Sequence, residues 1–232
     1  MLRIDRLNHY YGKNHILWNL ELDVPRGQCT CVMGRNGAGK TTLMKCIMGA
    51  EPVKSGSLAF AEGVELTQKN IEDRARLGIG YVPQGRQIFP MLTVEDNLRS
   101  GLGLRQSDSK IIPARVYELF PELREMRHRR GSELSDGQQQ QLAIGQALVI
   151  EPRLLILDEP AEGLQPNIVA QIGEVIRKLI EEDGLTVLLA EQKLPFARKY
   201  ADRFAILDQG RRVAEGDIAG LTDELIEKHL TV

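Results

Sequence analysis

A glycine-rich loop between an apolar run and a helix-like segment constrains the fold of this chain more than any other feature. Residues 34–41 read GRNGAGKT and match the pattern G-x-x-x-x-G-K-[ST] of a phosphate-binding loop. The apolar run CTCVMG (29–34) leads into the loop, and the helical pattern KTTLMKCIMG (40–49) leaves it. Because this strand–loop–helix context is what the motif requires, the sequence predicts a site for nucleotide phosphates.

The residue types in the loop suit phosphate and Mg²⁺. Glycines let backbone N–H groups converge on phosphate oxygens, and the positive end of the following helix dipole points at the same place. We expect Lys40 to hold the β- and γ-phosphates and Thr41 to ligate Mg²⁺. The predicted phosphate-binding residues are Gly34, Arg35, Asn36, Gly37, Ala38, Gly39, Lys40, Thr41 and Thr42.

Two adjacent carboxylates follow another apolar run. The segment LLILDE (154–159) places Asp158 and Glu159 at the carboxyl end of a predicted strand, where ligands of open α/β sheets bind. Asp158 suits a Mg²⁺-binding role, and Glu159 suits a general base that polarises the attacking water. A strand that merely ends in two solvated acids is the alternative, and the phosphate loop argues against it.

Apolar runs alternate with helical patterns along most of the chain. Runs typical of buried strands occupy residues 29–34, 78–85, 153–160 and 185–192. Helical patterns occupy residues 40–49, 114–126, 139–150 and 167–182. The alternation predicts an α/β fold with right-handed crossovers. The first 25 residues and the segment AILDQGRRVAEG (205–216), with its Gln-Gly turn, predict antiparallel strands in an edge layer.

Composition excludes several classes of protein. The 232 residues, 42% hydrophobic and 27% charged, suffice for one sizeable core, and a net charge of -2 gives no case for nucleic acid as the main partner. The three cysteines (29, 31 and 46) lack the spacing of a disulfide framework or a zinc site, so we expect them to be buried apolar residues. Neither a signal peptide nor an apolar run of membrane-spanning length is present, which predicts a cytosolic chain.

Four motifs together carry a resemblance to a known family. The segments GRNGAGKTT, YVPQGR, LSDGQQQQLAIGQAL and LLILDEPAEGL, in this order and spacing, resemble the nucleotide-binding subunit of an ABC transporter over essentially the whole chain. The resemblance implies a RecA-like P-loop NTPase core of about residues 1–84 and 151–232, with an antiparallel β subdomain and an inserted helical subdomain of about residues 85–150. It also implies that the chain binds and hydrolyses ATP with Mg²⁺.

The segment LSDGQ implies a contact with a second subunit. In the family, an L-S-G-G-Q segment begins a helix and touches the γ-phosphate of ATP held by the other subunit of a head-to-tail dimer. The matching residues are Ser135, Asp136, Gly137 and Gln138, of which Ser135 and Gly137 would reach the partner's nucleotide. The glutamines after the turn are expected to form the first turns of the helix.

Asp136 departs from the family pattern, because it replaces the first glycine of the usual pair. One like charge about 6 Å from a phosphate, at an effective dielectric near 20, costs roughly 3 kcal/mol, or about a hundredfold in association. An acid at a helix N-terminus gains only about 0.3 to 1 kcal/mol. If the side chain faces the phosphate, we expect weakened ATP-driven dimerisation, and Asp136→Gly should raise turnover; if it turns outward, capping prevails. An unchanged rate in the glycine variant would contradict the first expectation.

Other positions match the family one at a time. Tyr11 matches the aromatic residue that stacks on adenine, although a tyrosine packed on the edge sheet is the alternative. Gln84, in VPQG, matches the glutamine that approaches Mg²⁺ and links the site to the helical lobe. Gln192 stands where most members carry a histidine that contacts the γ-phosphate, and its amide donates a hydrogen bond but carries no proton or charge. The resemblance thus implies that Lys40, Glu159 and Gln192 form the catalytic set.

The segment RQIFPMLTVEDNL (86–98) resembles the surface that receives coupling helices of membrane subunits. Phe89, Met91 and Leu92 belong either to this surface or to the core. Both readings remain open from the sequence.

The amino-acid sequences of several segments indicate one branch of the family. YYGKNHIL, GQCTCVMGRNGAGKTTLMKC, YVPQGRQIFPMLTVEDNL and LLAEQ resemble the smaller ATPase subunit of the urea importer, with the branched-chain amino acid importer next. Such importers pair two ATPase subunits beneath two membrane-embedded permease subunits, and an exported solute-binding protein delivers the solute. The resemblance therefore implies a peripheral protein on the cytoplasmic face of the membrane.

The sequence leaves two other classes of function to compare with an importer motor. An ABC ATPase acting on nucleic acid or ribosomes would usually show a second cassette or a long insertion, and this sequence has neither. A catalytically weak, regulatory ATP-binding protein is suggested by Asp136 and Gln192 and opposed by the intact Lys40, Asp158 and Glu159. The importer motor is the function that the sequence favours.

Overall fold

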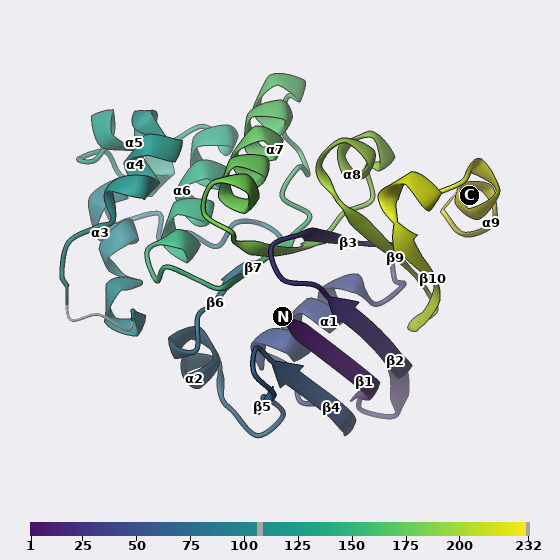
Figure 1. Ribbon diagram of the computed structural model, residues 1–232. Helices are drawn as coiled ribbons and strands as arrows, with labels where there is room; N and C mark the ends of the chain where they lie inside the picture. The colour runs from purple at the N-terminus through teal and green to yellow at the C-terminus, as the bar shows by residue number, and fades with distance from the viewer. Residues whose placement is uncertain (106–108, 231–232) are drawn as a thin grey trace.

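The computed structural model describes residues 1–105 and 109–230, and it contains a six-stranded and a four-stranded sheet (Figure 1). The six-stranded sheet, in the order β10-β9-β3-β8-β7-β6, consists of β3 (Cys29–Met33), β6 (Ile79–Val82), β7 (Leu154–Asp158), β8 (Thr186–Ala190), β9 (Arg203–Asp208) and β10 (Arg211–Asp217). The four-stranded sheet, in the order β2-β1-β4-β5, consists of β1 (Leu2–Tyr11), β2 (Asn14–Val24), β4 (Ser55–Phe60) and β5 (Val64–Glu65). The helices are α1 (Lys40–Met48), α2 (Ile71–Arg76), α3 (Val94–Arg99), α4 (Ala114–Leu119), α5 (Pro121–Glu125), α6 (Asp136–Leu148), α7 (Pro166–Glu181), α8 (Leu194–Tyr200) and α9 (Asp223–His229).

Parallel strands at the centre of the larger sheet confirm the predicted α/β fold. Strand β3 pairs in parallel with β8 and β9, and β7 pairs in parallel with β6 and β8. All residues of β3, β7 and β8 are buried, and successive side chains enter opposite cores. Leu155 and Leu157 join the core shared with the helices α3–α7, whereas Leu154 and Ile156 join the core shared with α1 and the antiparallel sheet. Continuous burial on both faces explains why these strands read as unbroken apolar runs.

The hairpin of β9 and β10 differs from the expectation of a common antiparallel edge layer. Strands β9 and β10 are antiparallel as predicted, but β9 pairs in parallel with β3, so the hairpin extends the larger sheet. Its turn still contacts the smaller sheet, because the Trp18 N–H donates to the Gly210 carbonyl at 2.9 Å. The smaller sheet instead gains β4 and β5, which the sequence pattern did not predict. The buried run Phe204–Leu207, shielded on both faces, is the physical reason that β9 lies inside the larger sheet.

The expected helix over residues 114–126 is two helices. Phe120 leaves the helical region with φ of -132° and ψ of 73°, and Pro121 opens α5. A proline lacks the N–H of a continuing helix and disfavours the helical conformation of the residue before it, so the helix breaks there. Helices α3–α6 lie together beside β6 and β7 (Figure 1). The subdomain boundaries suggested by the sequence remain a prediction.

The structure bears on two further expectations, which concern the cysteines and membrane-spanning helices. All three cysteines are free and buried, as predicted. Among the described residues, no helix combines the length and the apolar character needed to cross a membrane.

Candidate active site

The phosphate loop connects β3 to α1 with a backbone that only glycine fits at two positions. Gly34 has a φ of 152°, and a Cβ there would lie 2.4 Å from the carbonyl oxygen of Leu207. Gly39 has a φ of 104° directly before α1, where a side chain would meet Leu17 at 2.9 Å. These glycines allow the loop to turn tightly into the helix, as the motif predicts.

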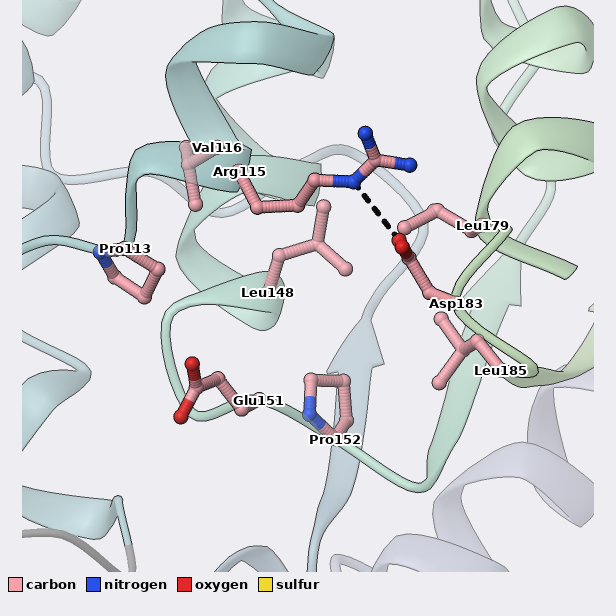
Figure 2. Close-up of a pocket in the computed structure, with 9 residues that line it drawn as sticks. All are labelled: Pro113, Arg115, Val116, Leu148, Glu151, Pro152, Leu179, Asp183 and Leu185. Atoms are coloured by element: carbon pink, nitrogen blue, oxygen red, sulfur yellow. Dashed lines mark hydrogen bonds and ion pairs between the residues drawn. The ribbon is translucent and has the colours of Figure 1, made fainter.

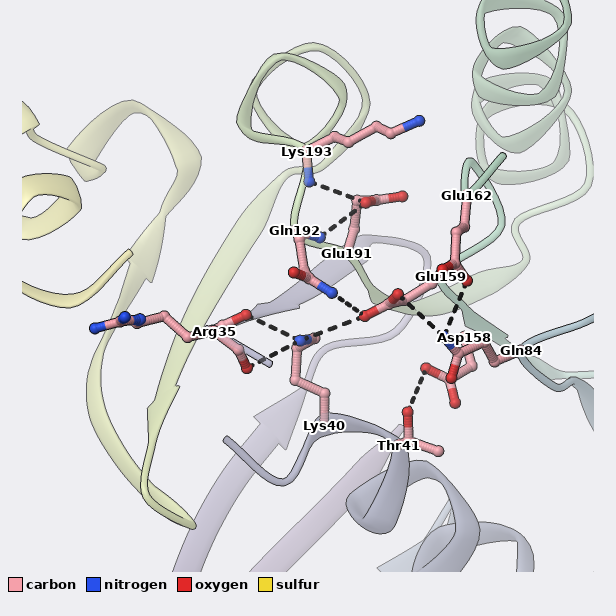
Figure 3. A network of polar contacts seen from close by, with 11 residues as sticks. Arg35, Lys40, Thr41, Gln84, Asp158, Glu159, Glu162, Glu191, Gln192 and Lys193 are labelled. Atoms are coloured by element: carbon pink, nitrogen blue, oxygen red, sulfur yellow. Dashed lines mark hydrogen bonds and ion pairs between the residues drawn. The ribbon is translucent and has the colours of Figure 1, made fainter. Parts of the chain in front are cut away.

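Lys40 is buried and lies across the loop that precedes it. Its Nζ donates to the carbonyl of Gly34 at 2.9 Å and to that of Arg35 at 3.3 Å (Figure 3). The same Nζ lies 3.4 Å from Oε1 of Glu159, and the two side chains are 4% and 10% exposed. A cation held at this depth, beside the converging N–H groups of a loop, suits a polyanionic ligand.

Glu159 directly follows β7 and contacts the carboxyl end of β8. Gln192, which follows β8, donates from Nε2 to Oε1 of Glu159 at 2.6 Å (Figure 3). Glu159 itself has a φ of 51°, and its N–H donates to the carbonyl of Ala190 at 2.9 Å. A non-glycine residue in the left-handed region is disfavoured, and such residues cluster at functional sites. The structure therefore brings Lys40, Glu159 and Gln192 together, as predicted.

Asp158 lies beside Thr41 at the end of β7. Thr41 Oγ1 donates to Asp158 Oδ1 at 3.2 Å. Burial raises the pKa of Asp158 to about 6, although the Thr41 hydrogen bond lowers it, and neighbouring Glu159 raises it further. Among the described residues, Oδ2 of Asp158 is buried with no hydrogen-bond partner. An unpartnered carboxylate oxygen next to a hydroxyl fits a hard, oxygen-loving cation such as Mg²⁺.

The described part of the chain offers few acidic, histidine or cysteine ligands around Asp158. Among residues 1–105 and 109–230, no group of three or more His, Cys, Asp or Glu side chains could hold a metal ion. Thr41 and Asp158 therefore fit a cation that takes further oxygens from nucleotide phosphates, which is how Mg²⁺ is usually held with such substrates.

Gln84 follows β6 and points at the acids rather than at Thr41. Its Nε2 donates to Glu162 Oε2 at 2.9 Å and lies 3.5 Å from Glu159 Oε2 (Figure 3). Glu162 was not predicted as a site residue; it follows LLILDE in the segment DEPAEG. Gln84 thus reaches the side chains of Glu159 and Glu162, and its approach to Mg²⁺ remains a prediction.

Glu191 is a second acid that the sequence analysis missed. It is buried and accepts hydrogen bonds from the backbone N–H groups of Gln192 at 2.8 Å and Lys193 at 2.9 Å. Burial raises the pKa of its carboxyl, which these hydrogen bonds lower in part. An acid inside the apolar run LLAEQ is the signal that could have identified it, because buried acids are rare without a specific role. Its hydrogen bonds fix the backbone that carries Gln192.

A cavity of about 320 Å³ joins the loop to an aromatic side chain. Its lining residues are Tyr11, Ile16, Asn36, Gly37, Gly39, Lys40, Thr41, Thr42, Gln84 and Glu159. Tyr11 is 41% exposed and also contacts the ring of His9 in the same strand, so its stacking on adenine remains a prediction. Ile16 is an apolar lining residue that was not predicted. A cavity lined by a cationic side chain, loop glycines and an aromatic side chain has the character of a nucleotide site.

Arg35 belongs to a neighbouring cavity. That cavity, of about 370 Å³, is lined by Gly34, Arg35, Asn36, Gln192 and Leu230. The phosphate loop therefore contributes to two cavities. Gln192 lines the cavity that contains Arg35, and its amide contacts Glu159, which lines the cavity that contains Tyr11.

Comparison with known proteins identifies the family. Residues 17–162 match the family model described as ABC transporter. The high-affinity branched-chain amino acid transport ATP-binding protein BraG of Pseudomonas aeruginosa is 42% identical over 222 residues, which are 95% of this chain and 94% of BraG. The chain belongs to the ABC transporter family. A probable branched-chain amino acid transport ATP-binding protein, LivF of Archaeoglobus fulgidus, is 37% identical over 98% of this chain and 94% of that protein.

Solved structures of ABC cassettes share the fold. A nucleotide-free ATP-binding cassette from an ABC transporter aligns with a TM-score of 0.85 at 26% identity, covering 98% of this chain and 94% of the cassette. A dimeric cassette in a post-hydrolysis state with ADP and Pi aligns with a TM-score of 0.84 at 23% identity, covering 95% and 100%. The chain is accordingly an ABC-type ATPase, and Lys40, Asp158 and Glu159 are the residues of its site that suit ATP hydrolysis.

The signature segment of this ABC ATPase begins α6 and is built as a capped helix start. Ser135 Oγ accepts from the N–H of Gln138 at 3.4 Å, and Gln138 Oε1 accepts from the N–H of Ser135 at 3.1 Å. Gly137 is buried, and a Cβ there would lie 3.0 Å from Ile168. Residues 135–138 are absent from the lining of both described cavities beside the phosphate loop. Their contact with a partner's nucleotide remains a prediction.

Asp136 makes a contact that the sequence did not predict. Its Oδ1 lies 2.6 Å from Nη1 of Arg86, two residues beyond Gln84. Asp136 is therefore neither an unpaired acid facing a phosphate nor the cap of α6: its side chain pairs with Arg86, and Ser135 caps the helix.

The apolar residues after Gln84 lie on the surface. Phe89, Met91 and Leu92 are 50%, 68% and 41% exposed, so the alternative that placed them in the core is wrong. A separate cavity of about 390 Å³, which we call the interlobe groove, has a lining that includes Ile79, Tyr81, Arg86, Gln87, Leu104 and Ala147.

A further cavity lies away from the phosphate loop. It has a volume of about 310 Å³ and is lined by residues of α4, the end of α6 and the end of α7 (Figure 2). Arg115 donates to Asp183 at 2.9 Å across its rim. None of the predicted site residues lines it.

Proposed function

We propose that this ABC ATPase is the motor subunit of an importer for a small polar solute. The observation that carries the proposal is that Lys40 and Gln192 both contact the carboxylate of Glu159. Glu159 and Lys40 line the cavity beside the phosphate loop. In this proposal Lys40 turns from the loop carbonyls to the β- and γ-phosphates of ATP. Glu159 accepts the proton of the attacking water, and Gln192 holds the carboxylate in place. General-base catalysis of this kind contributes about 10²- to 10⁴-fold.

Thr41 and Asp158 are the proposed holders of Mg²⁺, with Gln84 approaching it. Bound there, Mg²⁺ supplies charge neutralisation to the phosphates. The unpartnered Oδ2 of Asp158, among the described residues, supports this assignment. Tyr11 is the proposed stacking partner of adenine, since it is an exposed aromatic residue that lines the same cavity.

The proposed assembly has two ATPase subunits and two membrane-embedded permeases. A second ABC ATPase, identical or different, would lie head to tail with this one, so that Ser135 and Gly137 contact the ATP of the partner subunit. The exposure of the apolar residues Phe89, Met91 and Leu92 supports docking of the permease subunits at this surface. This arrangement places the chain at the cytoplasmic face of the membrane, with an exported solute-binding protein acting indirectly and no nucleic acid involved.

Urea and branched-chain amino acids are the two candidate solutes. The segments YYGKNHIL and YVPQGRQIFPMLTVEDNL favour urea, because they resemble the smaller ATPase subunit of the urea importer. The names of BraG and LivF favour branched-chain amino acids. Because an ATPase subunit does not contact the solute, transport itself has to decide between them.

Uptake of labelled urea and labelled leucine by cells of the source organism tests the proposal. The only copy of the chain carries Glu159→Gln, and Glu181→Gln, an exposed glutamate on α7, serves as the matched control. We expect the first variant alone to abolish uptake, of urea for the first candidate or of leucine for the second. Normal uptake of both solutes in the Glu159 variant contradicts both candidate solutes; together with retained ATP binding it would favour the regulatory alternative.

A further inference from the structure

We propose that Arg86 is a positioning residue that neutralises Asp136 and holds it back from the nucleotide of the partner subunit. The inference rests on the proposed function, because it concerns the contact between the signature segment and the partner's ATP. It explains how an ABC ATPase can carry an acid at a position that should repel a phosphate.

The geometry of Arg86 carries the inference. Its Nη1 donates to Asp136 Oδ1 at 2.6 Å, and its side chain is 19% exposed against 69% for Asp136. A short ion pair of this kind is charge-assisted and directional. The arginine is therefore the more buried member of the pair, and the exposed aspartate is the member that we infer it restrains.

The backbone around Arg86 is held in an unusual conformation. Gly85, Arg86 and Gln87 have φ values of 77°, 69° and 54°, so three successive residues are left-handed. Only the first is a glycine, and the other two occupy a region that side chains disfavour. Since the Arg86 side chain is mostly buried and ends on Asp136, the strained turn has the effect of directing the guanidinium to the start of α6.

Charge decides what this pair does. Unpaired, Asp136 would oppose association with a nucleotide-bearing partner by up to about a hundredfold, as worked above for 6 Å. A guanidinium in contact with the carboxylate cancels its charge at longer range. Solvent exposure and salt screen part of the repulsion, so we take about tenfold as the measurable effect of losing Arg86.

The position of Arg86 in the chain connects three parts of the molecule. Gln84, two residues earlier, contacts Glu162 and approaches Glu159. Arg86 and Gln87 line the interlobe groove. One short segment therefore touches Glu159 and Glu162 of this chain's own site, the interlobe groove, and the signature segment that would serve the partner's site.

A double-mutant experiment tests the inference. The full chain is purified from cells of the source organism through an affinity tag, with the subunits that it retains, and ATP turnover is measured at low and high ionic strength. The variants are Arg86→Gln, Arg86→Lys, Asp136→Gly and the double variant Arg86→Gln/Asp136→Gly. Arg203→Gln, which removes another exposed ion pair, to Asp217 at 2.8 Å, is the matched control.

We expect Arg86→Gln to lower turnover about tenfold at low ionic strength and less at high ionic strength. Arg86→Lys should recover most of the loss, and Asp136→Gly should suppress it in the double variant. Equilibrium binding of ATP by the isolated chain should stay within about twofold, because the chain's own cavity does not include Asp136. A folding defect would reduce ATP binding in Arg86→Gln and would not be suppressed by the glycine.

Two results overturn the inference. Turnover of Arg86→Gln equal to that of Arg203→Gln would show that the ion pair has no role, and a loss that Asp136→Gly does not suppress would show that Arg86 acts elsewhere. Both leave the proposed function intact. Absence of Glu159-dependent ATP turnover in the unmodified preparation would instead contradict the proposed function, and this inference with it.

Discussion

Replacing Asp158 by asparagine should stabilise the nucleotide-free protein while removing its response to Mg²⁺ and ATP. Asp158 is 1% exposed, and burial raises its pKa from 3.8 to about 6. Because folding raises this pKa, the ionised carboxylate destabilises the folded state. The penalty is full above pH 6 and disappears as the pH falls toward 3.8, where the carboxyl is protonated in both states.

The size of the effect follows from the shift of about two pKa units. At about 1.36 kcal/mol per unit, the penalty is about 3 kcal/mol. Asparagine carries no charge, and its carbonyl can still accept the Thr41 hydrogen bond, which spans 3.2 Å. In a chain of 232 residues, we expect a midpoint of thermal unfolding roughly 6 to 12 °C higher at pH 7.5.

Thermal and urea unfolding in EDTA, between pH 4 and pH 8, is the assay. The stabilisation by Asp158→Asn should shrink steadily below pH 6 and be nearly absent near pH 4. Asp223→Asn, at an exposed aspartate of α9, controls for the chemical change and should alter stability by less than about 0.5 kcal/mol. Added Mg²⁺ and ATP should stabilise the wild type and fail to stabilise Asp158→Asn. A less stable variant at pH 7.5, or a difference independent of pH, would refute the reasoning.

Two further predictions concern the loop and the surface. Gly34→Ala forces a Cβ to within 2.4 Å of the Leu207 carbonyl, so we expect about 2 to 3 kcal/mol of lost stability together with lost ATP binding, measured by urea unfolding and equilibrium binding; wild-type binding would contradict this. Met91→Asp changes a residue that is 68% exposed, so unfolding should change by less than about 0.5 kcal/mol while solute uptake in cells falls; unimpaired uptake would count against docking at this surface.

The strand ends of the site were predictable because several independent patterns agree on them. The glycine spacing before Lys40 and the acids after an apolar run each require a particular backbone, and parallel strands place their carboxyl ends at one edge of the sheet. Lys40, Asp158, Glu159 and Gln192 therefore meet without any need to know the helices in detail.

The features that were missed depend on contacts between distant segments. Strand β5 has two residues, too few for a pattern, and β4 begins with the small residues Ser55–Ser57, which give no apolar alternation. The partner of β4, strand β1, also lies far away along the chain. Hairpin residues 205–216 read as antiparallel strands, and no local rule says which sheet their first strand joins. The ion pair of Arg86 with Asp136 spans 50 positions and depends on a left-handed turn that a non-glycine sequence disfavours.

Single-turnover hydrolysis by Glu159→Gln tests the central claim most directly. Glutamine keeps the shape of the side chain but cannot accept the proton of water, and it removes the carboxylate that lies 3.4 Å from Lys40. The account predicts ATP binding at least as tight as in the wild type and a hydrolysis rate about 10²- to 10⁴-fold lower. Hydrolysis within about threefold of the wild-type rate, with ATP bound, would contradict the assignment of Glu159 as general base.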